Sequence, residues 1–385
     1  MTQAPAPDPT VAATPSPREI AAQLGRRVIG QTAAVREMAV GLAKHLAGLP
    51  TGNILMIGAS GTGKTTLMRA VEDYLASDPE LARRSTLVRL HANVLGEEAE
   101  RGRPGEAVLG RLLARAREQL GSEAPLDALL ERVRHGIVFI DEVDKIRSQV
   151  GDRPNVAGIR AQEALLTLIE NEAVPFDLPE WARRMVGRHP GGGGEAEDGV
   201  GGDGGTIRVD SSGLLFVCAG AFEGLHDTVY DRVTIGRDRG SLRSVTVVEA
   251  GEVKEELQFA LRDWLRNEDL FDYGMSPQFL SRFDSVVLLE NLELDELMKI
   301  LLESPESSLL QSRAWFASRG IRLAVSPAAV RAIAEAARRQ PRLGARALRE
   351  VFRRVIRDYE YDPERHAQDG GALVIDRQEV EDAIS

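Results

Sequence analysis

The 385-residue sequence contains a single cysteine, Cys218. One thiol cannot form an internal disulfide, and it cannot build a zinc site from several thiolates. The sequence also lacks the run of about 18 apolar residues that a membrane-spanning helix requires. Residues 1–17 have neither a cationic start nor an apolar stretch, so they do not resemble a signal peptide. We therefore expect no membrane insertion and a cytoplasmic location.

Basic residues are fewer than acidic ones, 48 against 59, which gives a net charge of −11. This excess repels a phosphate backbone at long range and disfavours nucleic acid as a partner, although a local basic surface inside a ring can still exist. The hydrophobic content of 43% and charged content of 28% are ordinary for a globular protein. The length predicts one large domain and a smaller one.

The N-terminal segment, residues 1–17, contains five prolines and almost no bulky apolar side chains, so we predict a disordered tail. From Arg18 onward, apolar residues recur at helical spacing in two segments that flank a turn at Gly30. These residues are Ile20 and Leu24, then Val35, Met38, Leu42 and Leu46. We predict two helices ahead of the first strand.

Short apolar runs predict strands at residues 53–57, 85–90, 137–140 and 214–217. Each is interpreted as apolar throughout, as in parallel strands that are buried on both faces. Helical stretches separate them, the first at residues 64–75. The sequence therefore predicts an α/β fold with a doubly wound parallel sheet.

The later part of the chain changes character. A glycine-rich stretch at 187–206 has the composition of a flexible insertion. After residue 290 helical patterns dominate, and they fall at 294–310, 327–339 and 344–359, before a short strand at 372–375. We predict a large nucleotide-binding domain at 18–290 and a small, mostly α-helical lid domain at 291–385.

Gly58–Thr65 matches the P-loop pattern, with an apolar strand before it and a helix after it. Its glycines let successive N–H groups point at phosphate oxygens, and the helix N-terminus adds partial positive charge. Lys64 is predicted to reach the β and γ phosphates of ATP, and Thr65 to bind Mg²⁺. A plain glycine turn before a core helix would not account for the full motif. The predicted nucleotide contacts are Gly58, Ala59, Ser60, Gly61, Thr62, Gly63, Lys64, Thr65 and Thr66.

The apolar strand at 137–140 ends in two carboxylates, Asp141 and Glu142. Such a pair is more often a strand entering a solvated turn, but the upstream P-loop favours a nucleotide-contacting strand. Asp141 is then predicted to hold Mg²⁺, largely through water, and Glu142 to polarise the water that attacks the γ phosphate.

These motifs, in this order, resemble the AAA+ ATPases, and within them the ClpX and HslU unfoldase subunits, over most of residues 18–380. The segments that carry the resemblance are Val28–Gln31, Gly58–Thr65, Ile140–Ile146, Gln162–Glu170, Leu214–Phe222, Ser276–Phe283 and Gly344–Arg346. The resemblance implies a Mg²⁺-dependent ATPase that assembles with itself, as a hexameric ring. It further implies that Val28 and Ile29 contact adenine, that Arg282 is an arginine finger acting in trans, and that Arg346 is the sensor-2 arginine acting in cis.

The sequence departs from this subfamily at four places. Its zinc domain cannot be formed by residues 1–17. The strand exit at Cys218-Ala-Gly offers little to hold a water. The aromatic and β-branched pair of the pore loop becomes Glu100 and Arg101, which give a poor hydrophobic grip on an unfolded chain. The tripeptide that docks on ClpP becomes Ile235-Gly-Arg237, which would bring a charge into an apolar pocket, so a ClpP-type peptidase is not expected as a partner.

Three functions are consistent with these residues. The first is an ATP-hydrolysing ring that remodels a protein partner without a protease, which the retained catalytic residues favour. The second is an ATP-ordered switch or scaffold with slow turnover. The third is a DNA-remodelling motor in which Arg101, Arg103 and Arg111 contact phosphates, although Glu97, Glu98 and Glu100 adjoin them.

Overall fold

The computed structural model describes residues 14–101, 105–151, 153–170, 173–186, 205–235, 243–249, 252–340, 343–366 and 371–384. The chain divides into two compact units, neither of which is continuous in sequence. We call Pro50–Ile57 with Ala82–Leu288 the sheet unit, and Met1–Leu49 with Gly58–Leu81 and Leu289–Ser385 the lid unit. The chain passes from the sheet unit to the lid unit after Leu288, close to the boundary predicted at 290. The grouping of the P-loop segment with the C-terminal residues was not foreseen.

The sheet unit is built on five strands, and every adjacent pair in the sheet is parallel. In spatial order the strands are β11 (Phe283–Leu288), β1 (Asn53–Ile57), β8 (Leu215–Gly220), β3 (Ile137–Asp141) and β2 (Leu87–His91). The predicted parallel α/β architecture is confirmed. The edge strand β11 was missed because exposed residues, Asp284 among them, interrupt its apolar pattern.

The prediction for β2 was wrong in its bounds and in its apolar pattern. It was expected at residues 85–90 and apolar throughout, but the strand begins at Leu87 and exposes Arg89 and His91. The reason is its position at the other edge of the sheet, where one face is not covered along its whole length. In contrast, all six residues of the interior strand β8 are buried.

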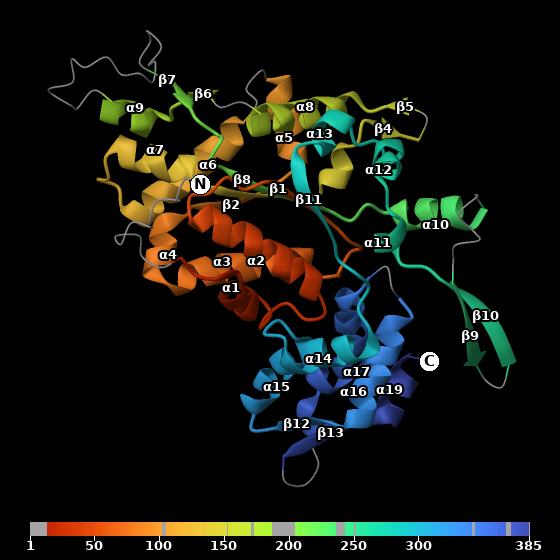
Figure 1. The fold of residues 1–385 in the computed structure, drawn as a ribbon. Coiled ribbons are helices and arrows are strands. Elements are labelled where there is room, and N and C mark those ends of the chain that lie inside the picture. Colours follow the sequence, from red (N-terminus) through yellow and green to blue (C-terminus); the bar gives the residue numbers. More distant parts are fainter. Residues whose placement is uncertain are drawn as a thin grey trace, which may run out of the picture. The chain divides into compact units, whose positions relative to one another are not determined.

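The helices of the sheet unit lie between its strands along the chain, in places several in succession. Their bounds are α5 (Asn93–Glu100), α6 (Glu106–Leu120), α7 (Leu126–Arg134), the 3₁₀ helix η1 (Val143–Ile146), α8 (Val156–Glu170), α9 (Glu180–Val186), α10 (Leu225–Ile235), α11 (Leu261–Trp264), α12 (Asn267–Tyr273) and α13 (Pro277–Leu280). Helices α5, α6 and α8 lie on the same side of the sheet (Figure 1). Their residues Leu95, Leu109 and Leu165 are fully buried in one core with the strands. The short helix α4 (Pro79–Arg84) contains the point at which the chain enters this unit.

Among the described residues, the sheet unit also contains three antiparallel strand pairs. They are β4 (Gln149–Val150) with β5 (Arg153–Pro154), β6 (Val174–Asp177) with β7 (Thr206–Val209), and β9 (Arg243–Glu249) with β10 (Glu252–Gln258). Strand β7 begins at Thr206, the last residue of the predicted insertion. Residues 187–204 of that insertion lie outside the described residues.

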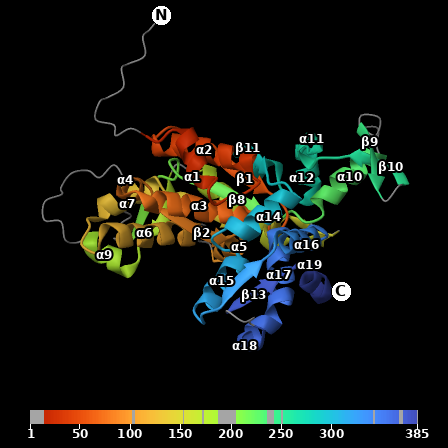
Figure 2. The same ribbon diagram turned by 90° about the horizontal axis from the view of Figure 1, so that it is seen from below.

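The lid unit is mainly helical. Its helices are α1 (Pro17–Leu24), α2 (Thr32–Leu46), α3 (Lys64–Ser77), α14 (Leu294–Glu303), α15 (Ser308–Ala317), α16 (Pro327–Arg338), α17 (Ala345–Tyr361), α18 (Pro363–His366) and α19 (Arg377–Ile384). Figure 2 shows α16, α17 and α19 lying together, and they share a core that includes Ile333 and Phe352. The two helices predicted before the first strand are confirmed as α1 and α2. Helix α1 begins at Pro17, the last residue of the predicted tail, because the hydroxyl of Ser16 caps it. Residues 1–13 of that tail lie outside the described residues. No helix in the ranges given above is long and apolar enough to cross a bilayer.

The single helix predicted at 294–310 is wrong, because the chain forms α14 and α15 with a turn between them. Pro305 lies in this turn, and a proline cannot continue the hydrogen-bonding pattern of a helix. Ser307 then begins the next helix, since its hydroxyl accepts a hydrogen bond from the N–H of Leu310 at 3.4 Å.

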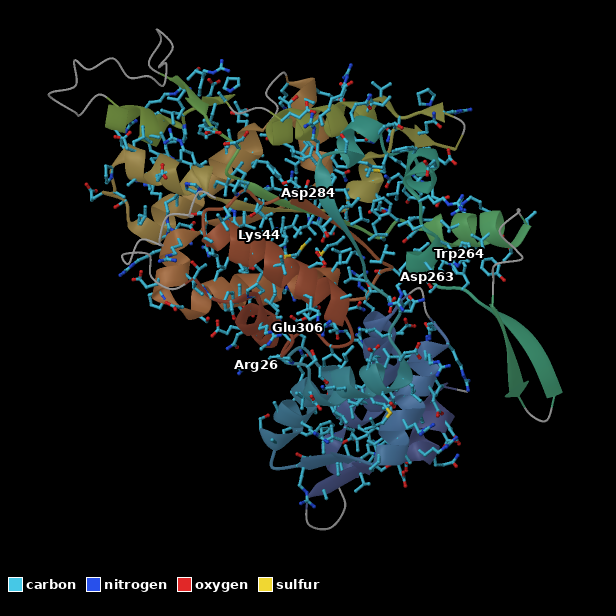
Figure 3. The ribbon with its side chains drawn as sticks, in the orientation of Figure 1. Arg26, Lys44, Asp263, Trp264, Asp284 and Glu306 are labelled. Carbon is cyan, nitrogen blue, oxygen red and sulfur yellow. The ribbon has the colours of Figure 1, made fainter. Side chains whose placement is uncertain are left out.

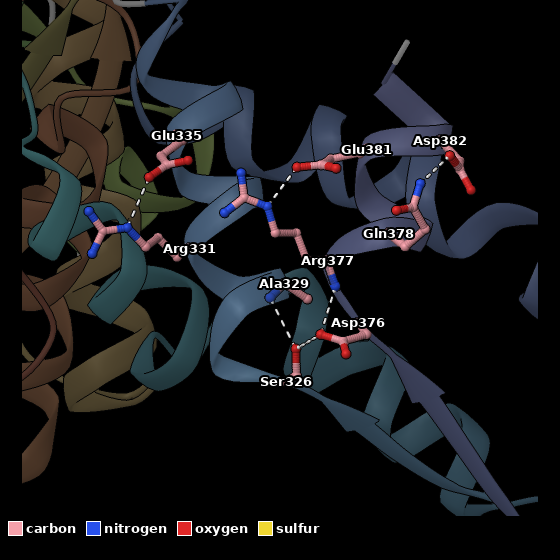
Figure 4. Close-up of polar contacts among 9 residues, drawn as sticks. All are labelled: Ser326, Ala329, Arg331, Glu335, Asp376, Arg377, Gln378, Glu381 and Asp382. Carbon is pink, nitrogen blue, oxygen red and sulfur yellow. Dashed lines mark hydrogen bonds and ion pairs between the residues drawn. The ribbon is translucent and has the colours of Figure 1, made fainter. Parts of the chain in front are cut away.

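A small parallel pair, β12 (Arg322–Val325) with β13 (Ala372–Ile375), aligns the starts of two helices. Ser326 follows β12 and accepts the N–H of Ala329 at 3.1 Å, which caps α16. Asp376 follows β13, accepts the hydroxyl of Ser326, and accepts the N–H of Arg377 at 2.8 Å (Figure 4). Strand β13 was predicted, whereas its partner β12 was not.

Candidate functional site

The P-loop turns sharply from β1 into α3. Gly61 and Gly63 have φ values of 77° and 113°, in the left-handed region that favours glycine. Gly63 is the residue preceding α3 and has no side chain with which to cap the first-turn N–H groups. A helix N-terminus of this kind attracts an anion through its N–H groups and its dipole.

Lys64 lies over this loop rather than in solvent, since only 9% of the residue is exposed. Its ammonium donates to the carbonyl oxygens of Gly58 and Ala59, the latter at 2.9 Å. The hydroxyl of Thr62 also donates to Ala59, at 2.9 Å. The cation is therefore held against acceptors that phosphate oxygens can replace with stronger, charge-assisted bonds.

The start of α17 lies directly against the P-loop within the lid unit. The N–H of Ala345 donates to the carbonyl oxygen of Gly61 at 3.0 Å. A β-carbon on Gly61 would lie 2.1 Å from the carbonyl oxygen of Leu343, so only glycine fits there. Arg346, the predicted sensor-2 residue, is exposed in the first turn of α17. The structure thus brings the Arg346 segment to the phosphate-binding loop.

The segment predicted to contact adenine is fixed near the same loop by Gln31, which is 4% exposed. The amide of Gln31 donates to the carbonyl of Glu290 at 2.8 Å and accepts its N–H at 3.1 Å. Val28 and Ile29 line a hollow of about 380 Å³ between α1 and α2, a volume in the range of small-ligand pockets. Two cations, Arg36 and Lys299, also line it.

In the sheet unit, Glu142 follows β3 with an unusual backbone. Its φ of 62° lies in the left-handed region that a β-carbon disfavours. Local bonds hold the turn: the N–H of Glu142 donates to Asp141 Oδ1 at 2.9 Å, and its carbonyl accepts the N–H of Lys145 at 2.9 Å. The Glu142 side chain is 48% exposed, with Oε2 3.6 Å from His91 Nδ1. The Glu142 carboxylate is therefore accessible to water.

Arg282, the predicted arginine finger, forms an ion pair with Glu170 of α8, and its side chain is 47% exposed. Its carbonyl accepts the side-chain amide of Asn53 at 3.0 Å, which fixes the backbone beside β1. An action in trans would require the guanidinium to exchange Glu170 for another anion.

The remaining predicted positions are less informative. Glu100 is the last residue of α5, and its carboxylate lies 3.9 Å from the guanidinium of Arg160. Arg101 follows as an exposed helix-ending residue. Ile235 ends α10 and is 82% exposed, whereas Gly236 and Arg237 lie outside the described residues.

Two buried polar residues were given no role from the sequence, although both lie in segments that carry the resemblance. Gln162 is 3% exposed and binds three main-chain groups: the carbonyls of Ile146 (2.8 Å) and Gly274 (3.0 Å) and the N–H of Ser276 (2.8 Å). Asp144, in η1, is 2% exposed. The available signal for Gln162 was a lone amide on the otherwise apolar face of a predicted helix.

Comparison with known proteins agrees with these features. Residues 49–286 match the family described as AAA domain (Cdc48 subfamily), and residues 292–361 match the C-terminal D2-small domain of ClpB protein. The chain is 31% identical over 366 residues to the ATP-dependent Clp protease ATP-binding subunit ClpX 3 of Methylococcus capsulatus, which covers 89% of this chain and 75% of the relative. It is 29% identical over 355 residues to ClpX 2 of Wolinella succinogenes, with 89% and 76% covered.

The chain therefore belongs to the AAA family of P-loop ATPases, with a parallel α/β nucleotide-binding fold and a helical lid. Within that family it is a ClpX-like AAA+ ATPase, an enzyme that hydrolyses ATP.

Proposed function

We propose that this ATPase forms a ring of identical subunits, six in number as the resemblance implies, and remodels a protein partner without a ClpP-type protease. The observation that carries the proposal is the P-loop itself. Its two left-handed glycines and the Lys64 ammonium form an anion site, and the backbone bond from Ala345 ties this site to the Arg346 segment. Nucleotide bound there would act on the loop and on α17 together.

Residue roles follow from the chemistry of each group. Lys64 and the N–H groups at the start of α3 bind the phosphates, and Val28 and Ile29 contact adenine. Thr65 and Asp141 would hold Mg²⁺, largely through water, and the ion would supply positive charge to the phosphates. Glu142 accepts a hydrogen bond from the attacking water and so directs its oxygen at the γ phosphorus, which releases ADP and phosphate.

Arginines make this chemistry depend on assembly. Arg282 delivers positive charge to the γ phosphate bound by a neighbouring subunit, and Arg346 does so within its own subunit. The ion pair with Glu170 neutralises Arg282 until the guanidinium leaves Glu170 for the γ phosphate of the neighbouring subunit. Turnover should therefore be slow in the monomer and fast in the ring.

We propose that the ATPase acts without a protease because charged residues occupy the pore-loop and docking-loop positions, where the subfamily has apolar residues. Glu100 and Arg101 are both exposed, and neither provides the aromatic surface that grips an unfolded chain. Arg237 stands where the docking tripeptide would need an apolar side chain. The relatives above are named as subunits of a Clp protease, and that assignment concerns those proteins.

The test compares wild-type protein with the double variant Glu100→Tyr, Arg101→Val. We expect wild type to hydrolyse ATP without unfolding a tagged fluorescent substrate and without stimulating a ClpP-type peptidase, whereas the variant gains unfolding activity. Unfolding or peptidase stimulation by wild type would contradict the proposal. Binding of ATP with negligible turnover in an assembled ring would support an ATP-ordered switch or scaffold. Turnover stimulated by added DNA would support a DNA-remodelling motor.

A further inference from the structure

The end of β8 carries no polar side chain, yet it is bonded to the turn that bears Glu142. Strands β8 and β3 are neighbours, with Cys218 paired to Ile140. Just beyond β8, the main-chain N–H of Ala221 donates to Asp144 Oδ1 at 3.1 Å. Asp144 lies two residues after Glu142, so its carboxylate joins the ends of the two strands.

The fit between these segments is tight. A β-carbon on Gly220 would lie 2.7 Å from Asp144 Oδ1 and 3.0 Å from the Asp144 nitrogen. Any side chain at position 220 would therefore push Asp144 away from Ala221. Oδ2 of Asp144 lies 3.7 Å from the ammonium of Lys145, which is half exposed. The carboxylate is thus buried, but both of its oxygens face donors.

The backbone at Glu142 needs such support, because a residue with a β-carbon resists a φ of 62° unless its surroundings fix it. The bonds from Glu142 to Asp141 and Lys145 are local and would move with the turn. Gln162 fixes the far end of η1 through the carbonyl of Ile146. Asp144 fixes the beginning of η1 by bonding it to the main chain just beyond strand β8 of the central sheet.

We propose that Asp144 is a positioning residue for ATP hydrolysis, which holds the Glu142 turn against the main chain at the exit of β8. The proposal rests on the function proposed above for Glu142 as the water-polarising group. It explains how a strand exit made of Cys218, Ala219 and Gly220 can still set the position of the attacking water. The N–H of Ala221 acts in place of a polar side chain, through Asp144.

A purely structural role makes different predictions from a positioning role. A residue that only stabilises the fold would lower the unfolding midpoint and leave the turnover of folded protein unchanged. A positioning residue changes kcat, because a displacement of about 1 Å in a reacting group can cost about 100-fold in rate. ATP binding depends on the P-loop, so the KM for ATP should stay close to that of wild type.

The experiment measures kcat, KM for ATP and the thermal unfolding midpoint for Asp144→Ala, Asp144→Asn and Gly220→Ala. We expect kcat to fall about 10- to 100-fold in Asp144→Ala, and to be largely restored in Asp144→Asn because the amide oxygen still accepts the Ala221 N–H. Gly220→Ala should reproduce the loss. Gly110→Ala is the matched control, since a β-carbon there meets nothing closer than 4.0 Å.

Wild-type kcat in folded Asp144→Ala, or an equal loss in the Gly220→Ala and Gly110→Ala variants, would overturn the proposal. If Asp144→Ala does not fold, the two glycine variants decide the question by themselves. Glu142→Gln is measured alongside to separate the role of Glu142 from that of Asp144. Wild-type turnover in Glu142→Gln would refute the role of Glu142. Loss of turnover in Glu142→Gln, together with normal turnover in Gly220→Ala, would refute only the role of Asp144.

Discussion

The P-loop and the Glu142 turn are both sharp turns with residues in the left-handed region, but different kinds of residue stabilise them. The P-loop uses glycines, Gly61 and Gly63, and is held by main-chain contact with Leu343 and Ala345. The Glu142 turn has no glycine and is supported by buried side chains, Asp144 and Gln162. The P-loop therefore depends on the absence of a β-carbon at Gly61 and Gly63. The Glu142 turn depends on polar side chains from other parts of the fold.

This contrast explains why the two regions should respond differently to substitution. Adding one methyl group breaks a corner made of glycine, because neither its conformation nor its surroundings can adapt. A corner held by several side chains should lose function or stability in steps as each bond is removed.

The largest effect is expected from Gly61→Ala. The added β-carbon would meet the carbonyl oxygen of Leu343 at 2.1 Å, at a φ of 77°. We expect the Kd for ATP to rise by about 100-fold or more, since the phosphate-binding N–H groups would be displaced together. Titration with a fluorescent ATP analogue provides the measurement.

Gly48→Ala is the matched control, since Gly48 also has a positive φ, 67°, but nothing lies within 4 Å of its β-carbon position. It should cost about 1 to 2 kcal/mol of stability and leave ATP binding intact. Equal loss of binding in both variants would mean that general destabilisation, and not contact with Leu343, is decisive.

A smaller effect, on stability, is expected from Gln162→Leu. The substitution leaves the carbonyl of Ile146 and the N–H of Ser276 without their Gln162 partner in a buried region. The carbonyl of Gly274 loses one of its bonds but still accepts the Ser148 N–H at 2.7 Å. We expect the free energy of unfolding to fall by about 2 to 4 kcal/mol, as judged by chemical denaturation. Gln278→Leu, at an exposed position of the same unit, should change it by less than about 0.5 kcal/mol. Equal costs would show that the amide does not organise these segments.

The smallest effect concerns Glu306, labelled in Figure 3, which lies in the turn between α14 and α15. It accepts hydrogen bonds from Arg27 at 2.7 Å and Arg69 at 2.8 Å. The bond from Arg27 is the main cause that holds the pKa of Glu306 below its usual 4.5. Because the pKa is lowered in the folded state, the stabilisation is present above pH 4.5 and is lost as the pH falls through the lowered pKa.

Glu306→Gln should therefore lower the free energy of unfolding by up to about 1 kcal/mol at pH 7, and by less as acid is added. Glu303→Gln is the control, since its carboxylate is 62% exposed and lies 4.0 Å from Lys299. A loss in Glu306→Gln that persists unchanged well below pH 4.5 would contradict the ion-pair explanation.

The sequence predicted the elements whose signal lies in a short, continuous stretch of residues. Strands β1, β3 and β13 were placed correctly because each is a continuous apolar run between turn residues, and the P-loop was recognised because its glycines must stand at fixed spacing. The break between α14 and α15 could have been read from Pro305, so that error was one of interpretation. Edge strands β2 and β11 were harder, since exposed residues interrupt their patterns.

The support of the Glu142 turn could not be predicted from the sequence by the same reasoning. Asp144 appears there as one more acidic residue after a strand, and its partner Ala221 lies 77 residues away. Gln162 binds groups up to 114 residues distant. Contacts of this kind depend on the packed fold, and neither propensity nor periodicity encodes them.

In the proposed mechanism Glu142 polarises the attacking water, and Arg282 makes turnover depend on assembly. The most direct test measures ATP hydrolysis by wild type, Glu142→Gln and Arg282→Ala, with the particle mass determined in the presence and absence of ATP. We predict that wild type turns over as a ring, and that both variants lose about 100-fold or more in kcat while Glu142→Gln still binds ATP and assembles. Wild-type turnover in Glu142→Gln would refute the role of Glu142, and an assembled wild-type ring that binds ATP without hydrolysing it would refute the proposed mechanism.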